Sequence, residues 1–89
     1  MLNVKYSSQA LNFLKNCEKD TSERILDKIK LLRENPFPKD VKRIEGYREK
    51  IYRIRVGKNR ILYEVDKENN LLGIVKIDKR ERVYWGFEL

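Results

Sequence analysis

The sequence contains no histidine among its 89 residues, and this absence removes a large part of the usual enzyme chemistry. Histidine is the common general acid and base near neutral pH and the commonest metal ligand. Cys17 is the only cysteine, so an internal disulfide is excluded, and one cysteine without histidine cannot build a zinc site. An enzyme of this composition must work with Arg, Lys, Tyr, Asp or Glu.

Glycine and long apolar runs are also scarce. With only four glycines, the chain has neither a P-loop nor a glycine-rich dinucleotide-binding motif. No apolar run is long enough to cross a bilayer. The first residues, MLNVKYSS, lack a signal-peptide pattern because Lys5 and Tyr6 interrupt the apolar stretch. We therefore expect a cytoplasmic protein that uses no cofactor and does not contact a membrane.

Basic residues outnumber acidic ones by 21 to 14, which gives a net charge of +7. The surplus is uneven, because residues 1–40 hold 8 basic and 6 acidic residues, whereas residues 41–89 hold 13 and 8. A basic half in a protein with a pI of about 9.6 favours an anionic partner, with nucleic acid as the first candidate. An ordinary basic surface is the alternative.

The first half of the chain predicts a short strand followed by two amphipathic helices. Residues 2–6 alternate as a strand does, and apolar residues recur at helical spacing over 10–17 and over 25–32. N-cap candidates are Ser7 or Ser8 for the first helix and Thr21 or Ser22 for the second. The nearly balanced charge of this pair and its apolar stripes indicate a structural role rather than a DNA-binding one.

The second half predicts three consecutive antiparallel strands at residues 51–56, 59–65 and 71–78. On the last of these we expect Leu71, Val75 and Ile77 to share one face. The whole chain, residues 1–89, is predicted to be one α+β domain. The N-terminal strand joins an edge of the three later strands to make a small, mainly antiparallel sheet of four strands, and the helical hairpin covers one face of that sheet.

The central hairpin carries arginines that face one another. With the turn at Gly57 and Lys58, Arg55 lies opposite Arg60, and like charges in that position repel. Burying unpaired arginines would cost several kcal/mol each, so the helices must cover the other face, and the face of Arg53 and Leu62 is expected to be open. Planar guanidinium groups on one face favour phosphate binding over a merely solvated strand.

Basic and aromatic residues alternate again near the end of the chain, in KRERVYW at residues 79–85. Such residues can neutralise phosphates and stack on bases, although packing of the aromatic rings onto the body is an alternative. The carboxylates of Glu45, Glu49 and Glu64 are possible general bases, and each is equally plausible as an ion-pair partner for an arginine.

Two stretches resemble toxins of the RelE/ParE superfamily from type II toxin–antitoxin systems, on the RelE side. One is RIEGYREKIYRIRVGKNRILYEV, residues 43–65, and the other is DKRERVY, residues 78–84. The order of strand, helical hairpin and three strands is similar as well, so the resemblance covers nearly the whole chain. It implies a metal-independent, ribosome-dependent endoribonuclease, or mRNA interferase, that cuts mRNA in the ribosomal A site and so inhibits translation.

The same resemblance implies which residues act. In such toxins the 2′-hydroxyl attacks the adjacent phosphate and leaves a cyclic phosphate and a 5′-hydroxyl. The residues that match the catalytic positions are Arg53, Arg55, Arg60, Arg80 and Tyr84. Further RNA contacts are expected from Lys58, Lys76, Lys79, Arg82 and Trp85. This chain departs from RelE in carrying arginine at 53 and 55, where RelE has lysine, which keeps charge stabilisation but disfavours proton transfer by that pair.

The resemblance also implies a partner. Type II toxins are held by an antitoxin whose disordered segment folds around them, so we expect a RelB-like antitoxin and a hetero-oligomeric complex. Two alternatives stay open, namely a ParE-like gyrase inhibitor without nuclease chemistry and a non-catalytic nucleic-acid-binding module.

Overall fold

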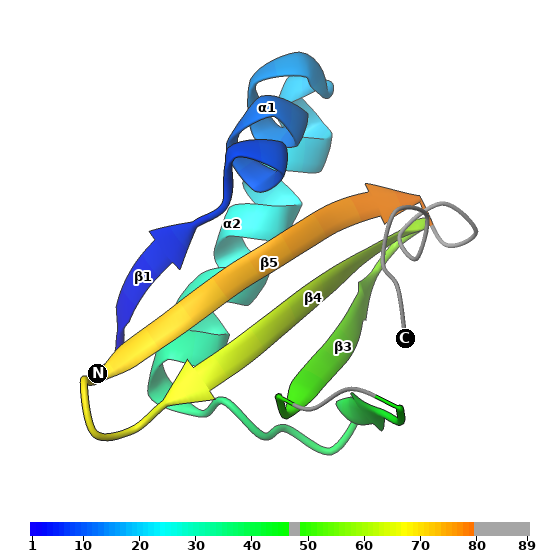
Figure 1. Ribbon diagram of the computed structural model, residues 1–89. Helices are drawn as coiled ribbons and strands as arrows, with labels where there is room; N and C mark the ends of the chain where they lie inside the picture. The colour runs from blue at the N-terminus through cyan, green and yellow to red at the C-terminus, as the bar shows by residue number, and fades with distance from the viewer. Residues whose placement is uncertain (47–48, 80–89) are drawn as a thin grey trace.

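The computed structural model describes residues 1–46 and 49–79, which form two helices and five strands (Figure 1). In chain order these are β1 (Asn3–Tyr6), α1 (Ser8–Asn16), α2 (Lys19–Glu34), β2 (Lys42–Ile44), β3 (Ile51–Val56), β4 (Asn59–Asp66) and β5 (Leu71–Lys79). The predicted residues Arg80, Arg82, Tyr84 and Trp85 lie outside the described part of the chain.

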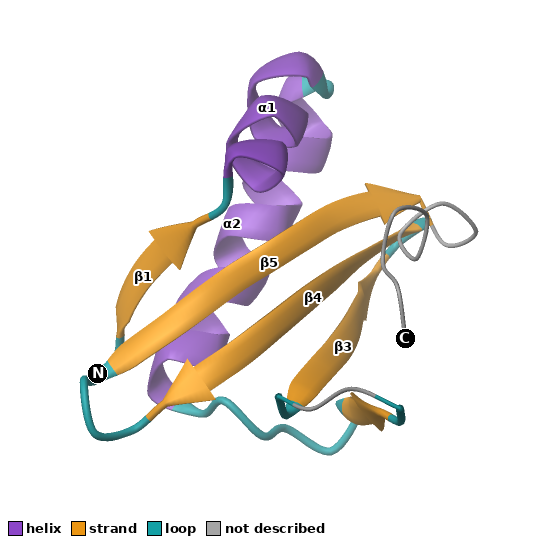
Figure 2. Ribbon diagram, in the orientation of Figure 1, coloured by secondary structure: helices purple, strands orange, loops and turns teal. Residues whose placement is uncertain are grey.

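The five strands form one sheet in the order β1-β5-β4-β3-β2. β1 pairs in parallel with β5 at one edge, and all other neighbours are antiparallel. Both helices lie on the same side of the sheet (Figure 2). The predicted α+β class, with a helical hairpin on one face of a mainly antiparallel sheet, is confirmed.

The number of strands was predicted wrongly, because β2 adds a fifth. It pairs with β3 so that Lys42 faces Arg53 and Ile44 faces Ile51. Three residues are too few for an alternating pattern to stand out in the sequence. This short strand forms the edge of the sheet beside the arginine hairpin.

The main core lies between the helices and the sheet. It contains Ala10 from α1, Ile25, Ile29 and Leu32 from α2, and Ile54, Val56, Ile61, Tyr63, Leu72, Ile74 and Ile77 from the strands. Ser7 joins α1 to the sheet, because its Oγ accepts a hydrogen bond from the Ala10 N–H at 3.1 Å and donates one to the Val75 carbonyl at 2.7 Å. Of the two N-cap candidates for α1, Ser7 is therefore the one used.

The N-cap prediction for α2 is wrong. This helix begins at Lys19, one turn earlier than expected, and Glu18 occupies the cap position without a side-chain hydrogen bond. The carbonyl of Glu18 accepts the backbone N–H of Ser22 at 3.0 Å, so Ser22 lies inside the first turn. That bond is the ordinary first hydrogen bond of the helix, so α2 begins without the side-chain cap that the sequence predicted.

A bulge in β5 overturns the expected face of Val75. Leu62 pairs with Lys76 and Tyr63 pairs with Ile74, which leaves Val75 without a partner in β4. Ile77 therefore lies in the main core, whereas Val75 belongs to a second apolar cluster.

That second cluster lies on the sheet face turned away from the helices. Ile51 is 4% exposed and Leu62 is 0% exposed, and Ile44 and Val75 pack against them. The expectation that this face is open is therefore wrong at one end of it, because apolar side chains from β2, β3, β4 and β5 cover one another there. Arg53, Arg55 and Arg60 of the hairpin lie on the same face.

Candidate functional site

The β3–β4 hairpin places Arg55 directly opposite Arg60, in the register predicted from the sequence. The turn needs glycine at position 57, where φ is +59°. A Cβ atom at Gly57 would also lie 3.1 Å from both terminal guanidinium nitrogens of Arg24 on α2. The turn is thus closely covered by α2, which helps to fix the end of the hairpin that carries the two arginines.

The sheet brings four basic side chains to one pocket. This basic pocket has a volume of about 260 Å³ and is lined by Asp40, Lys42, Arg53, Ile54, Arg55 and Arg60. Drug-sized ligands usually occupy pockets of about 300–1,000 Å³, so the basic pocket suits a smaller group. Its four cations and single carboxylate give the described lining a charge of +3, and a phosphodiester matches it in both size and sign.

Arg60 is the most enclosed of these cations. Its side chain is 6% exposed, and its Nε has no hydrogen-bond partner among the described residues. Leaving a buried donor unsatisfied costs about 1–3 kcal/mol, and more when the group is charged. A hydrogen bond from the Arg60 guanidinium to an oxyanion would offset part of this cost.

The chain that leads into β2 is tied to the sheet by an aromatic cluster. The Tyr63 hydroxyl donates a hydrogen bond to the Pro36 carbonyl at 2.6 Å. Tyr52 lies between the rings of Tyr63 and Phe37, with centroid distances of 5.8 and 5.0 Å. These contacts fix the segment that carries Asp40 toward the basic pocket.

A turn then directs Asp40 and Lys42. The Val41 N–H donates to the Pro38 carbonyl at 3.2 Å, and Asp40 Oδ2 lies 3.8 Å from Nζ of Lys28 on α2. The side chain of Asp40 remains 59% exposed. Sequence reasoning missed both pocket residues, because a carboxylate before a three-residue strand gives no periodic signal.

Tyr63 lies too deep to exchange protons near neutral pH. Burial raises the pKa of its phenol far above the ordinary value, and the charges of Tyr52 and Asp40 raise that pKa further. The hydroxyl therefore stays protonated and serves as a structural donor to Pro36.

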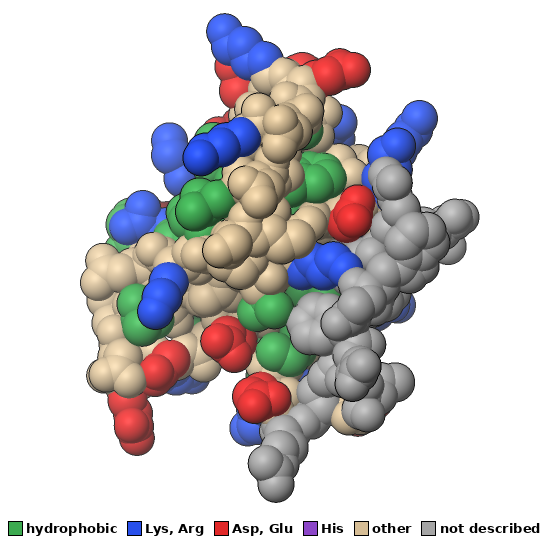
Figure 3. All heavy atoms as spheres, turned by 45° about the horizontal axis from the view of Figure 1, so that its top comes forward, with side chains coloured by type: hydrophobic (Ala, Val, Ile, Leu, Met, Phe, Trp, Pro, Cys, Tyr) green, Lys and Arg blue, Asp and Glu red, His purple; other side chains and the backbone are tan. Residues whose placement is uncertain are grey.

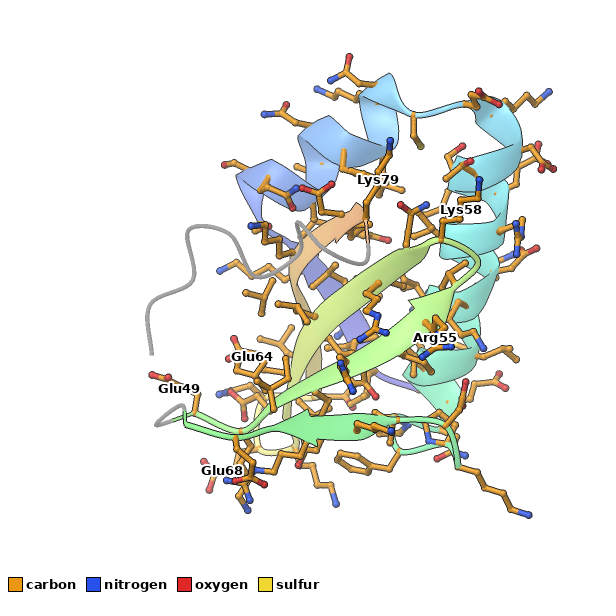
Figure 4. The ribbon with its side chains drawn as sticks, turned by 90° about the vertical axis from the view of Figure 1, so that its right-hand side faces the viewer. Glu49, Arg55, Lys58, Glu64, Glu68 and Lys79 are labelled. Atoms are coloured by element: carbon orange, nitrogen blue, oxygen red, sulfur yellow. The ribbon has the colours of Figure 1, made fainter. Side chains whose placement is uncertain are left out.

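The three predicted RNA-binding lysines that the structure describes do not line the basic pocket. Lys58 is exposed in the β3–β4 turn, Lys79 is exposed at the end of β5, and Lys76 faces Leu62. Figure 4 shows Arg55, Lys58 and Lys79 toward one end of the sheet. The predicted roles of these lysines stay predictions.

The three glutamates considered as general bases do not line the basic pocket. Figure 4 places Glu49 and Glu64 at the end of the sheet away from Lys58 and Lys79. The side chain of Glu64 lies over Gly73, whose missing Cβ leaves room for it. Within residues 1–46 and 49–79, no group of three or more acidic or cysteine side chains is placed to hold a metal ion.

Over the face that Figure 3 shows, basic side chains are interspersed with acidic ones. The charges on that face are mixed in sign, whereas the described lining of the basic pocket is mostly positive. Among the described helices, none is long and apolar enough to cross a membrane.

The fold and the pocket together define a class: a small α+β domain with a helical hairpin on one face of its sheet and a pocket lined by arginines of the β3–β4 hairpin. The profile described as the ParE toxin of the type II toxin–antitoxin system parDE matches residues 4–84. The chain belongs to the RelE/ParE superfamily of type II toxins.

Relatives on the RelE side support this assignment. A protein of Methanocaldococcus jannaschii provisionally named toxin RelE1 is 35% identical over 85 residues, which cover 92% of this chain and 93% of that protein. The archaeal RelE–RelB complex from Pyrococcus horikoshii contains a chain with a TM-score of 0.78 and 29% identity, with coverage of 91% of this chain and 97% of that one.

A third relative comes from the RelB–RelE antitoxin–toxin complex of Methanococcus jannaschii. That chain has a TM-score of 0.69 and 25% identity, with coverage of 93% of this chain and 98% of its own. Both archaeal structures are complexes of a toxin with its antitoxin. The expected resemblance to RelE-like toxins is confirmed.

Proposed function

We propose that this toxin is a ribosome-dependent endoribonuclease that cleaves mRNA in the A site. The observation that supports this proposal most directly is the basic pocket, in which Arg53, Arg55 and the enclosed Arg60 converge on a space of about 260 Å³. A messenger backbone supplies the phosphodiester for which this lining is suited.

The proposed reaction is metal-independent transesterification. The 2′-oxygen of one nucleotide attacks the adjacent phosphorus, and negative charge accumulates on the phosphoryl oxygens in the transition state. Preorganised cations stabilise that charge better than water does, because they need not reorient during the reaction. Arginines suit this role, since they keep their charge at all physiological pH values.

Each arginine has a proposed role. Arg60 and Arg80 clamp the scissile phosphate. Arg53 and Arg55 bind flanking phosphates and stabilise the dianionic transition state. Tyr84 stacks on a base or takes part in proton transfer, and Lys58, Lys76, Lys79, Arg82 and Trp85 hold the RNA around the cut.

The proposed partner outside the ribosome is a RelB-like antitoxin. Solved relatives are RelB–RelE complexes, and one of them shares 29% identity with this chain. We expect the antitoxin to bury apolar toxin surface and to neutralise or displace the basic site, so that coexpression rescues growth and yield.

A gyrase inhibitor of the ParE kind is a second candidate, because the matching profile bears that name. It would need no nuclease site, and the Nε of Arg60, buried without a hydrogen-bond partner among the described residues, would then have no part in the toxin's action. The observation therefore favours RNA cleavage.

One experiment separates these candidates. The toxin is induced in cells that carry a translated copy and an untranslated copy of one transcript, and cuts are mapped by primer extension. We expect cuts in the translated copy alone. Intact mRNA together with inhibited supercoiling would establish the gyrase alternative, and RNA binding without cleavage would establish a passive binding module.

A further inference from the structure

The proposed reaction needs a group that accepts the proton of the attacking 2′-hydroxyl. The arginines of the basic pocket cannot serve, because a guanidinium does not lose its proton in a protein. The chain has no histidine. The hydroxyl of Tyr63 stays protonated and donates a hydrogen bond to the Pro36 carbonyl. Two described side chains of the pocket lining remain, Asp40 and Lys42.

We infer that Asp40 is the general base of the toxin, an assignment that rests on the proposed nuclease function. A carboxylate carries free lone pairs that can accept a proton, whereas an ammonium group is a donor only. Asp40 and Lys42 line the same pocket as the hairpin arginines, so a phosphate bound there would lie near both.

The position of Asp40 suits a reacting group better than a structural one. Its side chain is 59% exposed, so a bound nucleotide can reach it. Its one recorded ion pair, to Lys28 within the described part of the chain, is long at 3.8 Å. An exposed ion pair of this length contributes little to stability, which leaves the carboxylate with no strong structural task.

Its backbone, in contrast, is well fixed. The preceding segment is held by the hydrogen bond from Tyr63 to Pro36 and by the turn from Pro38 to Val41. A general base must lie within hydrogen-bond reach of the proton it removes, so a rigid support for an accessible carboxylate is the arrangement such a role requires.

The 2′-oxygen forms a bond to phosphorus while its proton passes to a carboxylate oxygen of Asp40. The bond from phosphorus to the 5′-oxygen breaks, and that oxygen takes a proton from solvent to become a 5′-hydroxyl. Asp40 then returns its proton to solvent, and the RNA ends in a 2′,3′-cyclic phosphate.

The test uses the full-length toxin, translating ribosomes and a defined mRNA. We expect Asp40→Asn to slow single-turnover cleavage about 100-fold or more, and Asp40→Glu to keep part of the rate. The matched control is Asp27→Asn, which removes the same charge from an exposed position of α2 that does not line the pocket.

Binding is measured separately with an mRNA that carries a 2′-O-methyl group at the cut site and cannot react. We expect Asp40→Asn to bind this mRNA on the ribosome at least as tightly as the wild type, because a repulsive charge is gone. A structural role for Asp40 would instead weaken binding and lower the thermal midpoint.

Three outcomes would overturn the assignment. An Asp40→Asn variant that cleaves within about threefold of the wild type would exclude Asp40 as the base. A Lys42→Gln variant that loses the larger share of the rate would transfer the role to Lys42. A wild-type toxin that leaves translated mRNA intact would overturn the proposed function itself, and that result needs no variant.

Discussion

Arg60 faces two opposing demands, because it is charged and enclosed while its Nε has no partner among the described residues. Arg60→Met keeps the length of the side chain and removes the charge. We expect the free energy of unfolding to rise by about 1 kcal/mol, since replacing a poorly compensated buried charge with an apolar group is often stabilising. Cleavage should fall about 100-fold or more, because one donor to the transition-state oxyanion is lost.

Urea denaturation measures the predicted change in unfolding free energy, and primer extension measures the predicted loss of cleavage. Arg43→Met is the matched control, since Arg43 is exposed on β2 and does not line the basic pocket. It should change neither quantity appreciably. A large loss of stability in Arg60→Met would mean that the guanidinium supports the fold rather than the reaction.

Substitution of Tyr63 should lower the free energy of unfolding, whereas substitution of Arg60 should raise it. The Tyr63 hydroxyl donates to the Pro36 carbonyl, so Tyr63→Phe should lower the free energy of unfolding by about 1–2 kcal/mol at neutral pH. Because burial raises the pKa of Tyr63, the contribution of the phenol is complete below its unfolded value of about 10. It is lost as the pH rises toward the folded value.

Above about pH 10 the wild type should therefore lose the part of its unfolding free energy that comes from the Tyr63 hydroxyl, a part that the Phe variant lacks at every pH. Urea midpoints of both proteins, measured from neutral to strongly alkaline pH, would show the gap between them narrowing. A gap that stays constant over that range would contradict the assignment of the raised pKa.

Among the structural elements, the β3–β4 turn determines how the arginines meet. Gly57→Ala introduces a side chain at φ +59° and brings its Cβ within 3.1 Å of the Arg24 guanidinium. We expect a loss of about 1–2 kcal/mol in unfolding free energy and weaker cleavage, because Arg55 and Arg60 flank the turn.

Two further variants separate the causes. Gly57→Asn should recover part of the backbone cost, because asparagine tolerates positive φ. Combining Gly57→Ala with Arg24→Ala should recover the part that comes from the close contact. If neither variant improves on Gly57→Ala in thermal unfolding, the turn is not strained in the way proposed.

The hairpin and the two helices are predictable from sequence because each has a repeated pattern. Alternation over six to eight residues fixes which side chains of β3 and β4 share a face, so the pair of Arg55 and Arg60 follows directly. Helical spacing likewise identifies the buried positions of α2. These features depend on local periodicity, and periodicity is visible in the chain.

The features that were missed depend on contacts between distant segments. The bulge leaves Val75 without a partner in β4 and changes which face the following residues of β5 occupy. No pattern in the local sequence marks it. The β2 strand is too short to alternate, and Asp40 reaches the basic pocket only because Tyr63 holds the Pro36 segment. The enclosure of Arg60 is likewise a property of the assembled sheet.

Across the whole molecule, charge is arranged along the sheet. Figure 4 shows Glu49, Glu64 and Glu68 at one end, and Lys58 and Lys79 toward the other. Lys50 and Lys67 lie beside Glu68 at the first end, so the charge there is mixed, whereas the described lining of the basic pocket carries a net +3 and should draw an RNA strand across it. Such binding releases counterions and must weaken as salt rises.

The salt dependence of binding gives a quantitative test at this scale. With a short single-stranded RNA blocked by 2′-O-methyl groups, the logarithm of the association constant should fall linearly with the logarithm of salt concentration. Arg55→Ala should reduce the slope by about 0.7, the amount expected for one lost phosphate contact on a single strand. Lys15→Ala, at the exposed end of α1, removes an equal charge away from the pocket and should leave the slope unchanged. Equal reductions in both variants would mean that the RNA responds to net charge alone and not to the basic pocket.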